Sequence, residues 1–116
     1  PKENTKTMNY EFMLKNTNLP PCIPLPKAAL QLPISSTAKV MYARMLGEIL
    51  TGGIEDSNGI KYIRFPIMEL AITICRSPMT VKRALNELEQ AGMIMRVHQN
   101  VGETSHIYVL IPDDKM

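Results

Sequence analysis

Residues 77–92 constrain the fold more than any other stretch of this sequence, because they carry signals for both ends of one helix. The hydroxyl of Ser77 can accept a hydrogen bond from a free amide at a helix start, and Pro78 suits the first helical position, where no N–H is needed. Gly92 readily adopts the left-handed backbone conformation that ends many helices. The sequence therefore predicts a helix over residues 78–91.

The two sides of this predicted helix differ in chemistry. Apolar residues recur on one side at spacings of three and four, which is typical of a face packed against a core: Val81, Ala84, Leu85 and Leu88. The opposite side carries Met79, Lys82, Arg83 and Asn86, with Thr80 at the flank and Arg76 in the turn before it. Glu87 and Glu89 lie toward the far end. Positive charge is thus concentrated at the helix start, where the helix dipole is also positive.

Two further helices are predicted upstream. Pro66 suits the first position of a short helix over residues 66–74, and a tight turn at Cys75-Arg76 separates this helix from the next. Hydroxyl groups at residues 35–37 favour the start of a longer helix that runs to about Leu50 and ends at Gly52-Gly53. The residues expected on the core sides of these two helices are Ala38, Tyr42, Met45, Leu46, Ile49, Ile67, Leu70, Ala71 and Ile74. Residues 27–30 allow one or two helical turns before Pro33.

Strand patterns fall between and after these helices. Residues 60–65 are predicted to form a strand after a polar turn at residues 55–59, and residues 93–98 and 107–111 are predicted to form two more, joined by a polar loop around Gly102. The predicted order is helix, strand, helix, turn, helix, strand, loop, strand. This order indicates an α+β fold of the winged helix-turn-helix class, with a three-helix core, a small antiparallel sheet and one wing.

The length of 116 residues fits one domain, which we assign to residues 25–116. Residues 1–24 are expected to form an arm that is either flexible or docked, as a mere tail or as a brace for a dimer. A chain that begins at Pro1 is expected to be a piece of a longer protein. No apolar run approaches the roughly 18 residues of a membrane helix, so we expect a cytoplasmic protein.

Catalytic and metal chemistry find little support in the residue patterns. No glycine-rich phosphate cradle, zinc-protease motif or nucleophile elbow is present, so we expect no enzyme activity and no cofactor. Cys22 and Cys75 form no CxxC pair and are interpreted as buried or incidental thiols. His98 and His106 lack a third metal ligand and are interpreted as a pair of surface imidazoles. Five methionines are expected to fill the core: Met41, Met45, Met68, Met93 and Met95.

A second helix after a tight turn is the arrangement that enters the DNA major groove with its N-terminal residues. Lys82 or Arg83 can bond guanine O6 and N7, and Asn86 can pair with adenine N6 and N7. Ser77 and Thr80 can reach phosphates, Arg76 can grip the DNA backbone, and Met79 can contact a thymine methyl group. The complete candidate set for double-stranded DNA is Arg76, Ser77, Met79, Thr80, Lys82, Arg83, Asn86, His98, Gln99 and Asn100. The alternative is that these residues are simply the solvated side of an amphipathic helix.

Residues 25–112, about three quarters of the chain, resemble the N-terminal domain of the replication initiator protein A family, from plasmids and mobile elements of Gram-positive bacteria. The most specific likeness is Arg76-Ser77-Pro78-Met79-Thr80-Val81-Lys82-Arg83-Ala84-Leu85-Asn86-Glu87-Leu88. Weaker ones are Leu25-Pro26-Lys27, Ser36-Thr37-Ala38-Lys39-Val40-Met41-Tyr42, Asp56-Ser57-Asn58-Gly59, Phe65-Pro66-Ile67 and Ile107-Tyr108-Val109.

The resemblance implies a winged helix that binds repeated sites in a replication origin, usually as a homodimer. It also implies a separate C-terminal domain that recruits host replication proteins, for which this chain has no room. The family's wing commonly carries basic residues, whereas residues 98–106 contain no Lys or Arg and one acid, Glu103. Two other functions stay open: a transcriptional regulator of the same fold, and a protein-interaction module of a replication assembly.

Overall fold

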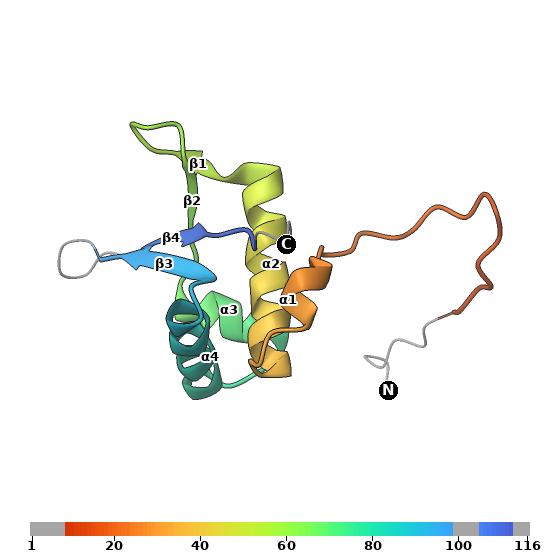
Figure 1. Ribbon diagram of the computed structural model, residues 1–116. Coiled ribbons are helices and arrows are strands. Elements are labelled where there is room, and N and C mark those ends of the chain that lie inside the picture. Colours follow the sequence, from red (N-terminus) through yellow and green to blue (C-terminus); the bar gives the residue numbers. More distant parts are fainter. Residues whose placement is uncertain (1–8, 99–104, 113–116) are drawn as a thin grey trace.

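The computed structural model describes residues 9–98 and 105–112. The elements within these residues are α1 (Lys27–Leu30), α2 (Ser36–Gly52), β1 (Ile54–Glu55), β2 (Lys61–Arg64), α3 (Ile67–Ile74), α4 (Pro78–Gln90), β3 (Ile94–Val97) and β4 (His106–Val109). Figure 1 shows α2 upright in the centre, with α1 on one side and α3 and α4 on the other. None of these helices is long and apolar enough to span a membrane within the described ranges.

The strands form one antiparallel sheet in the order β1-β2-β4-β3. The last strand, β4, therefore lies between β2 and β3, with Ile63 opposite Ile107 on one side and Arg96 opposite Ile107 on the other. The β3–β4 hairpin projects beside the start of α3 and above α4 (Figure 1). The predicted α+β winged helix-turn-helix class is confirmed.

The core lies where α2, α3 and α4 meet the inner face of the sheet. Every apolar residue predicted for the core side of α4 is buried, and Met41, Tyr42 and Met45 of α2 are fully enclosed. Ile49, Ile67 and Ile74 are only partly buried but pack against the same cluster. Burial of these side chains is the main driving force for the fold, at roughly 1.5–3 kcal/mol for each large apolar side chain. The predicted stripes are thus confirmed.

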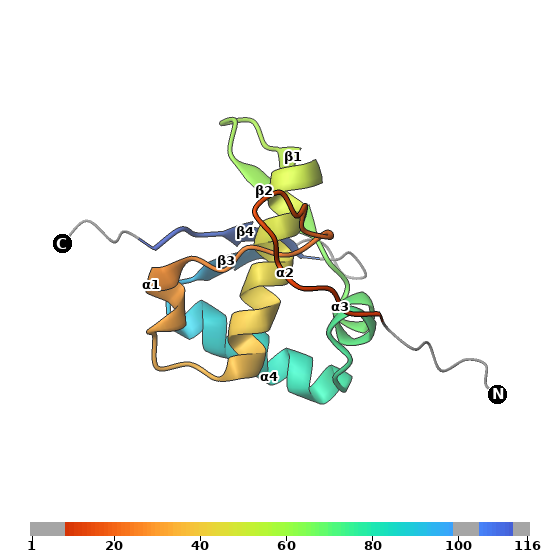
Figure 2. The same cartoon turned by 90° about the vertical axis from the view of Figure 1, so that its right-hand side faces the viewer.

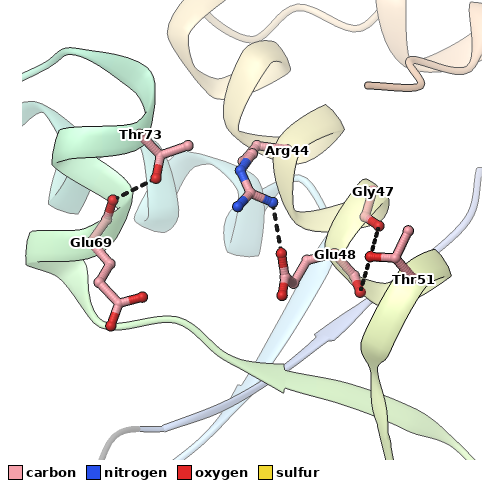
Figure 3. A network of polar contacts seen from close by, with 6 residues as sticks. All are labelled: Arg44, Gly47, Glu48, Thr51, Glu69 and Thr73. Carbon is pink, nitrogen blue, oxygen red and sulfur yellow. Dashed lines mark hydrogen bonds and ion pairs between the residues drawn. The ribbon is translucent and has the colours of Figure 1, made fainter. Parts of the chain in front are cut away.

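The polar side of α2 is partly covered, although the pattern predicts that it faces away from the core. The guanidinium of Arg44 lies 4.9 Å from the centre of the Phe65 ring and also donates to Glu48 at 2.8 Å (Figure 3). Gly47 on the same side faces Ile23 and Pro24, which pass close to the helix. In Figure 3 the Thr51 and Thr73 hydroxyls donate to carbonyls one turn earlier in α2 and α3.

The connection between α3 and α4 is a tight turn with a left-handed residue. Cys75 has φ 59° and ψ 48°, and the amide of Arg76 donates back to the carbonyl of Ala71 at 3.0 Å. Ser77 then caps α4 by accepting from the Thr80 amide at 3.2 Å, with Pro78 as the first helical residue. Gly92, with φ 78°, follows the last turn. Both predicted ends of this helix are confirmed.

Several boundaries differ from the sequence prediction. Pro66 precedes α3 as its N-cap residue with ψ 144° and is not the first helical residue, because its backbone remains extended. All three predicted strands are shorter than expected. The short strand β1 was not predicted, since two residues carry no alternating pattern.

The turn after β1 is tied to the sheet. Asp56 accepts from the amides of Asn58 and Ile60, and its other oxygen accepts from the Tyr108 hydroxyl at 2.8 Å. The bonds from Ile60 and Tyr108 lower the pKa of the Asp56 carboxyl. The predicted polar turn is therefore anchored to β4.

The core-filling prediction is wrong for two of the five methionines. Met68 and Met95 are 62% and 48% exposed, because one lies on the outer side of α3 and the other on the sheet face away from the helices. Cys22 and Cys75 are both exposed, so of the two interpretations, buried or incidental thiols, burial is excluded.

Residues 9–26 contain neither helix nor strand. They run from α1 away from the helices and turn back across the front of α2 in the second view (Figures 1 and 2). Their large apolar side chains are unusually open to solvent, with Tyr10 and Phe12 exposed by 85% and 91%. Four prolines in this stretch explain the lack of helix, since each removes an amide donor. The arm boundary at residue 24 stays a prediction.

Candidate nucleic-acid interface

The N-terminal half of α4 presents a continuous exposed surface. Met79 is 61% exposed, and Lys82, Arg83 and Asn86 are also exposed, on the side of the helix opposite its buried residues. Thr80 is half-buried at the flank, as the helical spacing predicts. The tight turn at Cys75 sets this helix at an angle to α3 (Figure 2), so that Val81 and Ala84 in its first two turns pack into the core while the opposite side faces solvent.

Lys82 and Arg83 make no hydrogen bond or ion pair within the described residues. No described residue therefore compensates their charges, at the end of α4 where the free amides add positive potential. A cationic surface on an exposed helix start is suited to a polyanion. The exposed positions of Lys82 and Arg83 thus agree with the spacing of apolar residues in the sequence.

The two acids of α4 are used inside the molecule. Glu87 accepts from the amide and the hydroxyl of Ser35, both at 2.7 Å, and so joins α4 to the start of α2. Glu89 forms an ion pair with Arg96 of β3 at 2.7 Å. The hydrogen bond from Arg96 lowers the pKa of the Glu89 carboxyl. Sequence reasoning placed both acids at the far end of the helix but missed these partners.

Ser77 and Thr80 differ in what they can offer to a ligand. The Ser77 hydroxyl donates to Thr80 Oγ1 at 2.9 Å and accepts from the Thr80 amide, so its proton is already in use. Thr80 Oγ1 accepts that bond and keeps its own proton for an external acceptor. Of the two hydroxyls, Thr80 is therefore the better phosphate donor.

Arg76 is exposed in the turn, where its Nη1 donates to the carbonyl of Cys75 at 3.0 Å. It borders a hollow of about 90 Å³ whose other walls are Ser36, Thr37, Val40 and Ile74. The first residues of α2 thus lie beside a guanidinium, an arrangement that favours an anion. Ser36 and Thr37 were recognised in the sequence only as a helix start, because their closeness to Arg76 depends on the packing of α2 against α3.

The wing residues are only partly described. His98 is exposed, with Nδ1 at 3.2 Å from the Ser105 hydroxyl, while Gln99 and Asn100 lie outside the described residues. His106 stacks on the Tyr62 ring at 4.0 Å, and its Nε2 lies 3.2 Å from Arg64 Nη2. Of the predicted pair of surface imidazoles, His98 is exposed, whereas His106 is half-buried and contacts Tyr62 and Arg64. No group of three metal-ligating side chains occurs in the part of the chain that the structure describes.

One of the two polar side-chain atoms of Asn86 forms a hydrogen bond within the protein. Its Oδ1 accepts a hydrogen bond from Arg96 Nη2 at 2.7 Å. Because a guanidinium has only donors, the amide oxygen must face Arg96 and the NH₂ group is left for other partners. Arg96 was not among the candidate residues, since the sequence places it in a strand with no sign that it reaches α4.

The comparisons with known proteins identify the fold. No family model matches the sequence, and no curated protein matches it. Among solved structures, one described as the N-terminal domain of a DNA-binding protein matches with a TM-score of 0.63 and 15% identity, over 91% of this chain and 86% of that one.

Two further solved structures share the fold. One, described as an MDR initiator, has a TM-score of 0.66 and 19% identity, over 80% of this chain and 78% of its own. The other, described as a Rep–DNA complex, has a TM-score of 0.65 and 16% identity, over 80% of this chain and 77% of its own. At these identities the likeness shows a shared fold, which is the α+β winged helix described above.

Proposed function

We propose that this chain binds double-stranded DNA with sequence specificity through the N-terminal half of α4, as part of replication initiation. The observation that carries the proposal is a pair of cations, Lys82 and Arg83, that have no partner among residues 9–98 and 105–112 and lie on the exposed side of a helix whose acids are both used internally. The DNA-binding and initiator descriptions of the structural neighbours support it.

The geometry supports a docking in which α4 enters the major groove with its first two turns. Lys82 and Arg83 then reach guanine O6 and N7, and Met79 contacts a thymine methyl group. Thr80 and Arg76 bind phosphates on one side of the groove, where the amides and hydroxyls of Ser36 and Thr37 add a second contact. His98 and the adjoining wing residues 99 and 100 contact the backbone beyond.

In its finer form the proposal is that a homodimer recognises repeats in the replication origin of a plasmid or mobile element. Host replication proteins would then be recruited by a further domain. The chain acts by binding and has no catalytic step in this proposal. Sedimentation that detects only monomer at high concentration would contradict the dimer.

A second candidate function is a protein-interaction module of a replication assembly. It is favoured by the arm, whose Tyr10, Phe12, Met13 and Leu14 are all more than 60% exposed. Exposed large side chains on an extended segment are typical of partner contacts. In that case, replacing the cations of α4 by alanine would leave DNA affinity unchanged.

The test of DNA binding is a salt titration. Affinity for a duplex carrying origin-type repeats is measured by fluorescence anisotropy across salt concentrations, beside a scrambled duplex of equal length. With roughly four phosphates neutralised, we expect a log–log slope of about −3 to −4 and tighter binding to the repeats. A flat slope, or equal affinity for both duplexes, would contradict the proposal.

A further inference from the structure

The side-chain amide of Asn86 is held in one orientation by a residue from another element. Arg96 Nη2 lies 2.7 Å from Asn86 Oδ1, and these atoms belong to β3 and α4. A guanidinium cannot accept a hydrogen bond, so the reversed amide would place two donors against each other. The oxygen of Asn86 therefore faces the wing strand.

Arg96 is itself anchored. Its Nε and Nη2 donate to Glu89 Oε1 at 3.0 and 2.7 Å, and its side chain is only 18% exposed. A guanidinium fork with a fixed carboxylate keeps a defined plane, which a lysine in the same place would not. The chain of contacts from Glu89 through Arg96 to Asn86 thus fixes the amide before any ligand arrives.

What Asn86 can offer outward follows from this orientation. Its exposed group is NH₂, which donates only. In the major groove guanine presents two adjacent acceptors, O6 and N7, thymine presents O4, adenine presents the acceptor N7 beside the donor N6, and cytosine presents only a donor. Adenine recognition by Asn needs the amide oxygen to accept from N6 while the NH₂ donates to N7. A second donor at that oxygen would approach beside the positively charged Arg96.

We propose that Arg96 makes Asn86 act chiefly as a hydrogen-bond donor, so that Asn86 favours a keto base, guanine or thymine, over adenine, whose N6 donor would meet the oxygen that Arg96 already engages. Arg96 is a positioning residue, because it acts through Asn86. This inference rests on the proposed DNA binding and names the base chemistry read by one residue of that surface.

The test is selection from randomised duplexes with the intact chain and three variants. Asn86→Ala locates the base position, because the preference there is lost while other positions keep theirs. At that position the unmodified chain is expected to favour guanine or thymine over adenine by roughly tenfold, the scale of one good base contact. Arg96→Met frees the amide oxygen, and adenine is expected to gain about tenfold relative to the keto bases.

Arg64→Met is the matched control. Arg64 lies in β2, which β4 separates from the strand of Arg96, and it contacts His106, so this variant loses the same charge without touching Asn86. Both Arg→Met variants are expected to weaken binding to all duplexes, but only Arg96→Met is expected to change the order of base preference at the Asn86 position. Thermal melting monitors folding. Should Arg96→Met unfold, Arg96→Lys keeps a cation beside Glu89 but loses the planar fork, and is expected to shift preference in the same direction.

A preference for adenine in the unmodified chain, or an unchanged base order in the Arg96 variants, would overturn this inference while leaving DNA binding intact. Absence of any sequence preference in the unmodified chain would overturn the proposed function as well. A measurement without DNA tests the orientation of Asn86 independently of the proposed DNA binding. The NMR signals of the Asn86 NH₂ group are expected to shift in Arg96→Met and not in Arg64→Met, whatever the protein binds.

Discussion

The two halves of α4 carry opposite charges and have opposite relations to the rest of the molecule. In the first half, Lys82 and Arg83 make no polar contact within the described residues. In the second half, Glu87 bonds Ser35 of the chain before α2, and Glu89 bonds Arg96 of β3. One helix thus serves as an outward-facing surface at its start and as a structural junction at its end.

The comparison shows that a charged side chain on the exposed side of an amphipathic helix can either stabilise the fold or bind a ligand. Its tertiary contacts indicate which of the two it does. A charge with an internal partner contributes to folding and has little potential left for a ligand. A charge without one costs little to expose and retains its full attraction for an anion. If this division is correct, substitutions in the first half change binding and those in the second half change stability.

The largest expected effect comes from removing the outward charges. We expect Lys82→Ala with Arg83→Ala to lower the affinity for the preferred duplex roughly 100-fold or more, since two base or phosphate contacts are lost. The free energy of unfolding should stay within about 0.5 kcal/mol, because neither side chain has a partner in the part of the chain that the structure describes. Anisotropy titrations and urea unfolding measure the two quantities.

The matched control is Lys27→Ala with Lys61→Ala, which removes the same charge from exposed positions on α1 and β2. It should weaken binding only slightly. Unchanged affinity in the α4 variant would end the DNA-binding proposal and favour the protein-interaction module.

A smaller effect is expected at the junction. Glu87→Ala removes the acceptor for both the amide and the hydroxyl of Ser35. Hydrogen bonds to a charged group contribute about 1.5–3 kcal/mol when well protected, and this partly exposed pair should contribute about 1 kcal/mol. Urea unfolding is the measurement, with Gln90→Ala on the exposed side of the same turn as control. DNA affinity should not decrease in Glu87→Ala. If the free energy of unfolding of Glu87→Ala equals that of Gln90→Ala, the contact between Glu87 and Ser35 does not stabilise the fold.

The smallest effect concerns pH. The hydrogen bond from Arg96 lowers the pKa of Glu89 in the folded protein below its ordinary value of 4.5. The folded state then binds fewer protons than the unfolded state, so the contact stabilises the fold above about pH 4.5 and this stabilisation is lost as the pH falls through the lower folded pKa.

Glu89→Gln does not titrate but retains an oxygen that can accept from Arg96. Below the ordinary pKa of 4.5, the urea midpoint of the unmodified chain should fall more steeply with decreasing pH than that of the variant. Parallel curves for the two proteins would show that Glu89 has the same pKa in both states.

Local signals predicted much of the fold. Ser77, Pro78 and Gly92 define the ends of α4 through backbone chemistry that involves only neighbouring residues. The buried residues of α4 follow from helical spacing alone. Short elements were less predictable: β1 has two residues, and Pro66 can stand either just before or just inside a helix.

The candidate site also has features that local sequence predicts and features that depend on tertiary contacts. The exposure of Lys82 and Arg83 follows from their position opposite a core-facing stripe, so it was predictable. The contact of Ser36 and Thr37 with the hollow beside Arg76, and the bond between Arg96 and Asn86, join elements that are distant in sequence. No local pattern marks such pairs.

By itself, the sequence determined where α2 and α4 begin and end, which faces meet the core and which side of α4 carries outward charges, because these depend on backbone donors and on the periodicity of apolar side chains. Only the tertiary structure decided which outward charges are already satisfied and which way the Asn86 amide points. Those outcomes depend on distances of about 3 Å between groups that the chain brings together only when α2, α4 and the wing pack against each other.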